Sequence, residues 1–196
     1  MRQPPPPVPQ GRCPYKVFVS STYLDNQKRR KLVQDAITMA GMVWHGMEIF
    51  TASTRPTVEE CLRYAGEADL LVGIIAWRYG WEPEGRKSIT EMEYDAAKDR
   101  LMFLLDPEMP VTPNKDYDLE GDKWDKQKKL EAFKGRIRQD QMPALFDETT
   151  LQAKVLQALN DWRDRREPKP LPEPKEIKET PIHPPDEDLE EEIRLY

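Results

Sequence analysis

The sequence predicts an α/β fold, in which a parallel sheet of about five strands carries helices on both faces. The first observation is that short apolar runs alternate with segments of helical period, and that such a strand-then-helix unit occurs four times. The second is the run Leu70–Trp77, which contains no polar side chain, as expected of a strand that is buried on both faces. Units of this spacing need right-handed crossovers, so we expect neighbouring strands to be parallel.

The first unit combines a strand, a polar turn and a helix. The run Lys16–Ser20 is rich in β-branched and aromatic residues and predicts the first strand. Thr22 and Asp25 have the spacing of a capping box, so the helix is expected to begin there and to stop at Gly41. Apolar residues recur with helical period at Leu32, Val33, Ala36, Ile37 and Ala40.

Three further units follow the same plan. Their strands are predicted at residues 42–47, 70–77 and 101–105, and capping boxes at Thr57–Glu60 and Ser88–Glu91 open the helices that follow the first two of these strands. The expected inward residues are Val58, Cys61, Leu62 and Ala65 in the earlier helix, and Ile89, Met92, Ala96 and Ala97 in the later one.

The last third of the domain departs from this alternation before it resumes. Residues 106–122 contain prolines and an Asp-rich turn, and they predict a surface insertion. A charged helix from Trp124, a short edge strand at 142–146 and a final helix from 147 to about 165 follow. The residues expected to face inward are Leu130, Phe133 and Ile137 in the charged helix, and Leu151, Val155, Leu159 and Trp162 in the final one.

Composition sets the expected domain limits at 15–166. Residues 1–14 are rich in proline and predict a disordered leader, or a Pro-rich ligand for another domain. Residues 167–196 alternate proline with charge and predict a linker or tail, in which Leu189 and Ile193 mark a possible short docking helix.

Charge and cysteine content exclude several classes of function. The tail contains ten acidic and four basic residues, which accounts for the whole net charge of −6 and leaves residues 1–166 neutral. A neutral domain argues against direct nucleic-acid binding by phosphate neutralisation. Cys13 and Cys61 form neither a disulfide framework nor a metal-ligand pattern. No run has the length of a membrane span, so we expect a cytoplasmic protein without a membrane partner.

Two carboxylates after the central strand are candidates for chemistry. Glu91 is three residues after Ser88, where a glutamate reaches back to the amide of the capping residue, so its expected role is structural. Glu93 shares the apolar side of the helix or its border, and a carboxylate there needs a partner or a function. Glu93 is therefore the predicted catalytic residue, with a buried ion pair to Arg78 or another base as the alternative.

Other polar groups follow the predicted strands at their carboxyl ends, where ligands bind in open α/β sheets. The turn Ser20–Thr22 predicts an anion site made of hydroxyls and helix amides, or helix capping alone. The loop after the central strand brings aromatic and basic residues to the same edge. Gly80–Ser88 differs from a phosphate-binding P-loop in spacing and charge, which argues against nucleotide hydrolysis through that loop.

Taken together, these motifs resemble the DUF4062 family, a group similar to TIR domains and to nucleoside 2-deoxyribosyltransferase-like folds. The resemblance covers about residues 16–162 and implies a flavodoxin-like sheet. It also implies cleavage of NAD+ at the nicotinamide–ribose bond, with Glu93 as the catalytic glutamate. The motifs that carry it are Val17–Thr22, Gly46–Glu48, Asp69–Ile75, Arg78–Gly80 and Ser88–Tyr94.

The resemblance implies roles for further residues, and it makes NAD+ the substrate, with no bound cofactor and no metal. Ser20–Thr22 would hold a phosphate or a ribose hydroxyl, Arg78 the pyrophosphate, and Glu48 would orient the ribose. The remaining expected substrate-binding residues are Trp77, Tyr79 and Trp81, any of which would hold a base, and Ser88.

The same resemblance implies a switch-like effector in prokaryotic immunity. It would act as a homo-oligomer, assembled through the loop at residues 50–56, and a sensor or regulatory partner would lie beyond the tail. Two alternatives remain open. One is a non-catalytic TIR-like self-association module. The other is a nucleoside or nucleotide N-glycosidase, or a deoxyribosyltransferase-like enzyme, that works through a covalent Glu93 ester.

Overall fold

The computed structural model describes residues 14–46, 58–111, 118 and 123–167. These residues form the predicted α/β fold, with a parallel sheet of five strands in the order β2-β1-β3-β4-β5. This strand order is flavodoxin-like, and it reverses direction between β1 and β3. The predicted leader, apart from Pro14, and the predicted tail beyond Glu167 lie outside the described residues, so the predicted domain limits stay predictions.

The helices and strands lie close to their predicted positions. The strands are β1 Lys16–Ser21, β2 Val43–His45, β3 Leu70–Ile75, β4 Arg100–Leu105 and β5 Ala144–Phe146. The helices are α1 Tyr23–Met39, α2 Val58–Glu67, α3 Ile89–Ala96, α5 Lys123–Asp140 and α6 Leu151–Arg166, and a 3-10 turn, η2, spans Pro83–Gly85.

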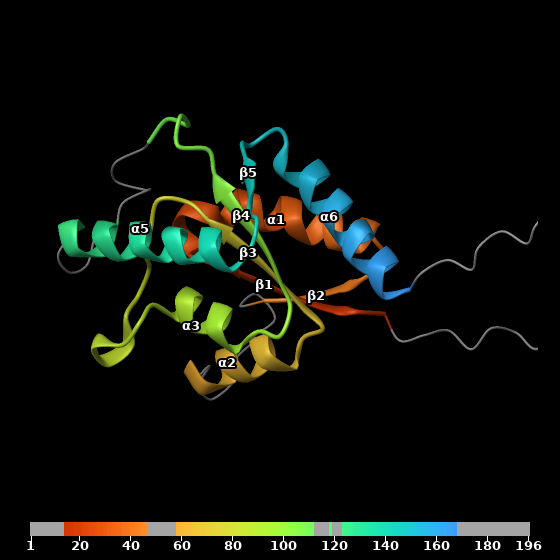
Figure 1. The fold of residues 1–196 in the computed structure, drawn as a ribbon, viewed down its shortest axis with the longest axis horizontal. Helices are drawn as coiled ribbons and strands as arrows, with labels where there is room; N and C mark the ends of the chain where they lie inside the picture. Colours follow the sequence, from red (N-terminus) through yellow and green to blue (C-terminus); the bar gives the residue numbers. More distant parts are fainter. Residues whose placement is uncertain (1–13, 47–57, 112–117, 119–122, 168–196) are drawn as a thin grey trace, which may run out of the picture. The chain divides into compact units, whose positions relative to one another are not determined.

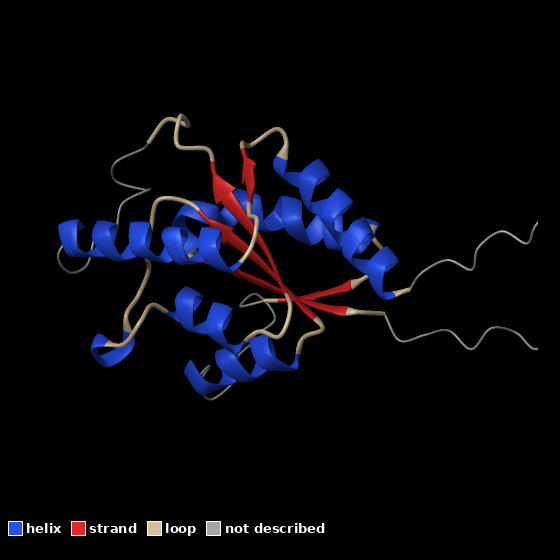
Figure 2. Ribbon diagram, in the orientation of Figure 1, coloured by secondary structure: helices blue, strands red, loops and turns tan. Residues whose placement is uncertain are grey.

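Helices cover both faces of the sheet, as predicted. Helices α1 and α6 pack on one face, and α2, α3 and α5 lie on the other (Figure 1). Figure 2 shows the strands as a central layer between these two groups. The edge strand β5 is the short one predicted at residues 142–146.

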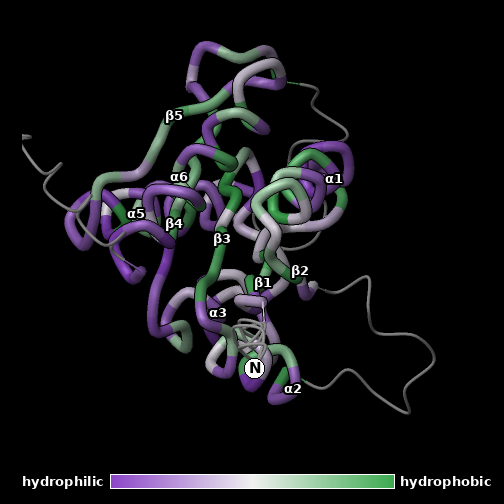
Figure 3. Tube along the Cα trace, turned by 90° about the vertical axis from the view of Figure 1, so that its right-hand side faces the viewer, coloured by the Kyte–Doolittle hydropathy of each residue, from purple (hydrophilic) through white to green (hydrophobic). Residues whose placement is uncertain are grey.

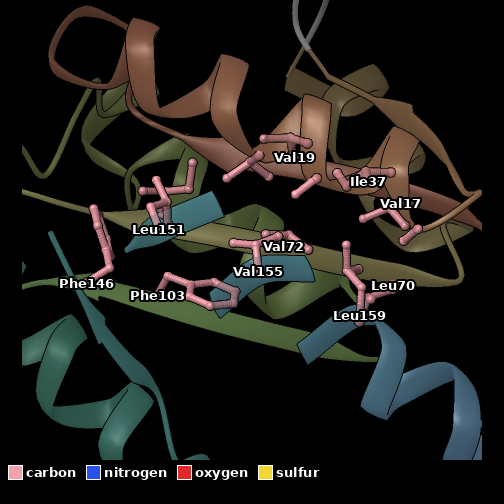
Figure 4. Packing of buried hydrophobic residues seen from close by; sticks show 14 of the residues in the cluster. Val17, Val19, Ile37, Leu70, Val72, Phe103, Phe146, Leu151, Val155 and Leu159 are labelled. Carbon is pink, nitrogen blue, oxygen red and sulfur yellow. The ribbon is translucent and has the colours of Figure 1, made fainter. Parts of the chain in front are cut away.

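The core has two layers because side chains alternate across the strands. Val17 and Val19 of β1 pack with Ile37 of α1 and with the apolar stripe of α6, as Figure 4 shows. Phe18, between them in sequence, packs on the opposite side with Phe133 of α5. The apolar stripes predicted for α5 and α6 are therefore confirmed.

Strand β3 is buried along its whole length, as its composition predicts. It appears as a continuous hydrophobic segment with one paler stretch in Figure 3. Its central position, between β1 and β4, explains why neither face carries a polar side chain. Among the described helices, none combines the length and the apolar character needed to cross a membrane.

The buried side of α3 differs from the predicted one. Of the four apolar residues expected to face inward, only Ala97 is buried, and it lies just after the helix. Tyr94 turns into the core instead, where its ring makes an edge contact with Phe133. This rotation also buries Glu91 and Glu93, so α3 presents polar groups to the interior at its amino-terminal end.

Candidate functional site

A cavity of about 520 Å³ lies near the carboxyl ends of β1 and β3, where the strand order reverses. This is the place where ligands bind in open α/β sheets. Five of the predicted site residues line it, namely Ser21, Thr22, Arg78, Trp81 and Glu93. Further lining residues, none of them predicted as a site residue, are Tyr23, Leu24, Gly80, Ile89, Thr90, Asp118 and Lys126.

Glu93 is the buried carboxyl group of this cavity. Its exposed fraction is 3%, and the Ser20 hydroxyl donates a hydrogen bond of 2.5 Å to its Oε2 atom. Burial raises the pKa of Glu93 to about 7, and this effect outweighs the Ser20 hydrogen bond and the charge of Arg30, which both lower it. The group therefore changes its charge near neutral pH, a property found in catalytic carboxyl groups.

The turn at the end of β1 is held by bonds within the protein. Ser21 Oγ donates to the Thr22 carbonyl at 3.0 Å and accepts from Arg30 Nη1 at 2.9 Å. Arg30 is itself buried, with an exposed fraction of 1%. Ser20 supports Glu93 and is not among the described residues that form the cavity wall.

Thr22 does not form the predicted capping box. It is the N-cap residue of α1, but its side chain makes no cap hydrogen bond there. Its hydroxyl instead donates to Asp25 Oδ1 at 2.6 Å and accepts from Asn26 Nδ2 at 3.1 Å. The prediction failed because the Thr22 oxygen accepts from the Asn26 side chain in place of a helix amide, and because the Asp25 carboxylate accepts from the Thr22 hydroxyl in place of the Thr22 amide.

Asp25 is a second buried carboxyl group beside the site. Burial raises its pKa to about 6, although the hydrogen bond from Thr22 lowers it and the charges of Arg78 and Arg29 lower it further. Arg29 forms an ion pair of 2.6 Å with Glu148, which lies just before α6. Polar contacts therefore connect Asp25, beside the cavity, through Arg29 with Glu148, just before the last helix α6.

Basic residues and a buried aspartate form another part of the cavity wall. Asp118 accepts hydrogen bonds from the amides of Tyr79 and Gly80, at 2.9 Å and 3.3 Å, and pairs with Arg78 at 3.5 Å. Lys126 Nζ donates to the Gly80 carbonyl at 2.8 Å and lies 3.9 Å from Asp118. The predicted surface insertion thus places one buried residue, Asp118, in the site.

Gly80 allows the loop after β3 to approach the turn after β1. Its φ of +98° favours glycine, and a Cβ atom there would lie 2.9 Å from Thr22 Cγ2. The sequence therefore needs glycine at this position for the two halves of the site to meet.

Two of the predicted base-binding aromatic residues lie away from the cavity wall formed by the described residues. Trp77 packs against the core on the α1 and α6 side. Tyr79 is buried in the opposite core layer, and its hydroxyl donates to Glu91 Oε2 at 2.6 Å. Trp81 does line the cavity and is 58% exposed, beside Tyr23 and Leu24, which are also exposed.

Ser88 caps α3, but only half of the predicted capping box forms. Its hydroxyl accepts from the Glu91 amide at 3.3 Å. Its own amide donates to the Tyr79 hydroxyl at 3.3 Å, whereas Glu91 binds Tyr79 and forms an ion pair with Arg136 at 3.0 Å. The Tyr79 hydroxyl takes the place that the glutamate was expected to fill.

The remaining predictions about the site concern Glu48 and metals. Glu48 and the loop at residues 50–56 lie outside the described residues. Within the described part of the chain, no three histidine, cysteine or carboxylate side chains gather in a way that could hold a metal ion.

Sequence analysis missed three charged residues in or beside this site for identifiable reasons. Asp25 was assigned to helix capping, and its burial gave no signal in a helix whose apolar period begins later, at Leu32. Lys126 lies in a segment so rich in charge that no single lysine stands out. Asp118 reaches the loop after β3 across a separation of 39 residues, which no local pattern predicts.

Several solved structures are similar to this chain. A diflavin flavoprotein A3 from Nostoc sp. shares 13% identity, with a TM-score of 0.44, over 81% of this chain and 99% of its own. The TIR domains of the activated Roq1 resistosome, which recognises the pathogen effector XopQ, share 14% identity, with a TM-score of 0.40, over 75% of this chain and 84% of their own. A flavodoxin-like domain from Synechococcus sp. shares 13% identity, with a TM-score of 0.45, over 76% and 98%.

No curated protein matches the sequence. A family model does match it, over residues 16–160, and that model describes a domain of unknown function, DUF4062. The matched range includes every described strand and almost all of the described helices. The chain therefore belongs to the DUF4062 family.

Proposed function

We propose that the domain hydrolyses NAD+ at the N-glycosidic bond, releasing nicotinamide and ADP-ribose, with Glu93 as the catalytic residue. The observation that supports this proposal is the position of Glu93. Its carboxyl group is buried in the wall of a cavity that also contains two basic side chains and an exposed tryptophan. That combination suits a ligand with a sugar, phosphates and a flat base.

The chemistry requires a negative charge beside the sugar. As the bond between C1′ and the nicotinamide nitrogen breaks, its electron pair leaves with neutral nicotinamide, and positive charge develops on the ribose. An ionised Glu93 would stabilise this oxocarbenium-like state, as carboxylates do in glycoside hydrolysis. Water then adds to C1′ and loses a proton to the solvent. Ser20 would hold the carboxylate in place through its hydrogen bond.

The raised pKa of Glu93 fits this role once the substrate is bound. The group is partly protonated near pH 7 in the free protein, because burial disfavours its charged form. NAD+ carries a positive charge on its nicotinamide ring, and a positive charge beside the carboxyl group would lower its pKa. Binding would therefore ionise Glu93 at the moment when the charge is needed.

The rest of the cavity wall supports the same substrate. Arg78 and Lys126 would face the two phosphates, and Trp81 would stack against a base. NAD+ would be the substrate and not a bound cofactor. Oligomerisation, a sensor or regulatory partner and a role in prokaryotic immunity belong to this proposal as its biological setting.

The test is the release of nicotinamide by the full chain, measured by chromatography at high protein concentration with a crowding agent that favours assembly. We expect Glu93→Gln to lower the rate at least about a hundredfold, the size of effect seen when a group that stabilises transition-state charge is removed. Asp95→Asn is the matched control, because Asp95 lies on the same helix but is exposed at the surface. It should keep the wild-type rate.

The outcomes separate the alternatives. Unchanged activity in Glu93→Gln would remove Glu93 from the mechanism. Turnover of nucleosides or nucleotides in place of NAD+ would favour the N-glycosidase or deoxyribosyltransferase reading. Failure of assembled protein to consume any of these compounds would leave a self-association module as the better account.

A further inference from the structure

The three hydroxyl groups of the turn Ser20–Thr22 each donate their proton within the protein. Ser20 donates to Glu93 at 2.5 Å, Ser21 to the Thr22 carbonyl at 3.0 Å, and Thr22 to Asp25 at 2.6 Å. A hydroxyl group has one proton to donate and two lone pairs that accept. Ser21 and Thr22, the two of these residues that line the cavity, therefore have no hydroxyl proton left for a ligand.

The chemistry of the partners fixes the direction of these bonds at Ser21 and Thr22. A carbonyl oxygen cannot donate, and the Arg30 guanidinium, which bonds Ser21 Oγ at 2.9 Å, cannot accept. The Thr22 hydroxyl lies between the Asp25 carboxylate, an acceptor, and the Asn26 amide group, a donor at 3.1 Å. Each hydroxyl keeps at least one lone pair, so each can only accept from a ligand.

We infer that the hydroxyls of this turn recognise a donor-bearing group, the hydroxyls of a ribose, and do not donate to phosphate. The inference rests on the proposed function in taking the ligand to be a ribonucleotide. It assigns the phosphate instead to Arg78 and Lys126, the basic side chains of the cavity wall.

The distribution of donors and acceptors around the cavity carries this assignment. Ser21, Thr22 and Glu93 line the cavity and offer lone pairs, whereas Arg78 and Lys126 offer only protons. Asp118 also lines the cavity, and its carboxylate pairs with both basic residues. Phosphate oxygens accept hydrogen bonds at neutral pH, so they would meet other acceptors at the turn. The two hydroxyls of a ribose can both donate, which matches an acceptor-rich wall.

The experiment is a calorimetric titration of the full chain with AMP, 2′-deoxy-AMP, 3′-deoxy-AMP and inorganic phosphate. AMP is checked for integrity afterwards by chromatography. We expect at least one deoxynucleotide to bind roughly tenfold more weakly than AMP, because a hydrogen bond to the turn or to Glu93 is lost.

Two substitutions of Thr22 separate recognition from structural support. Thr22→Val has almost the same shape but no hydroxyl, and it should reduce the preference for AMP over the deoxynucleotides. Thr22→Ser retains the hydroxyl and should keep that preference. Neither should change the affinity for inorganic phosphate, which Lys126→Gln should lower.

Three results would overturn the inference: equal affinity for AMP and both deoxynucleotides, a loss of phosphate affinity in Thr22→Val as large as the loss of AMP affinity, or no binding of AMP at millimolar concentration. These are binding measurements. A failure of NAD+ cleavage would count against the proposed function and leave a measured preference for ribose intact.

Discussion

The two halves of α1 bury different kinds of side chain. The first half, next to the cavity, buries Asp25, Asn26, Arg29 and Arg30, whereas the second half buries apolar residues such as Ile37. Both halves belong to one continuous helix. A single helix thus lines the candidate site at its amino-terminal end and supports the hydrophobic core at its carboxyl-terminal end.

The cost of burying charge makes the first half of α1 unusual. Burying a charged side chain costs several kcal/mol unless partners compensate for the lost water. Arg30 bonds Ser21, and Arg29 bonds Glu148 and the Asn26 side chain, so partners are present for both. An apolar stripe would be a simpler source of stability, so the first half of α1 relies on its polar partners to offset the cost of burial.

The largest expected effect lies in the apolar half. Ile37 is fully buried between β1 and the helices on that face. We expect Ile37→Ala to lower the free energy of unfolding by about 3 kcal/mol, through lost burial and the cavity that remains. Urea denaturation measures this change.

The matched control is Met39→Ala in the same half, where the side chain is 65% exposed. It should change the free energy of unfolding by less than about 0.5 kcal/mol. Equal destabilisation by the two substitutions would show that the apolar half does not support the core in the way described.

These two halves also differ in how well the sequence predicts them. Val33, Ala36 and Ile37 lie three or four residues apart, and this period predicts both the helix and its buried side. Asp25 and Arg30 carry no such signal, because the same residue types usually lie at the surface. Both contact the turn after β1, Asp25 through Thr22 and Arg30 through Ser21, and the spacing of these residues does not show that the contacts are buried.

The same distinction applies to the candidate site. The burial of Glu93 was predictable because the sequence places this carboxylate near the apolar side of its helix. The directions of the side chains in the loop after β3 could not be predicted. Tyr79 turns into the core, whereas Trp81 turns to the rim of the cavity. That choice depends on Asp118, which holds the loop backbone from a distant segment.

The next largest effect concerns the stability contribution of Glu93. Its pKa is raised from 4.5 to about 7 in the folded protein, so the folded state binds the proton more tightly than the unfolded state. The stabilisation is present below about pH 4.5 and is lost as pH rises through 7, to a total on the order of 3 kcal/mol. Glu93→Gln removes this loss and should be more stable than wild type at about pH 8.

Thermal or urea unfolding of both proteins across this pH range measures the difference. The advantage of the variant should grow steadily between about pH 5 and about pH 8. A constant difference at all pH values would mean that Glu93 does not carry the raised pKa.

A smaller effect of the same sign is expected at Asp25. Its pKa is raised from 3.8 to about 6, chiefly by burial, so its stabilising contribution is lost as pH rises through 6. The value of about 6 already includes the hydrogen bond from Thr22 and the attraction of two arginines, which lower the pKa. The shift is slightly smaller than that of Glu93, so we expect Asp25→Asn to gain somewhat less than Glu93→Gln at pH 8, on the order of 3 kcal/mol, measured by urea unfolding. If the variant is less stable than wild type at that pH, the hydrogen bonds and ion pairs of the Asp25 carboxylate stabilise the fold by more than its burial destabilises it.

The smallest expected change in stability is that of Arg30→Met, although this substitution should alter function. Arg30 lowers the pKa of Glu93 through its charge, so its removal should raise that pKa further. Glu93 can then remain protonated, and at about pH 6 the loss of its buried partner should cost less than about 1 kcal/mol. The rate of NAD+ cleavage should begin to rise at a higher pH than in the wild type, because the Glu93 carboxylate then forms at a higher pH. If the pH dependence of the rate is unchanged and the variant loses much stability, Arg30 supports the fold, as the residues in the second half of α1 do, and does not act on Glu93.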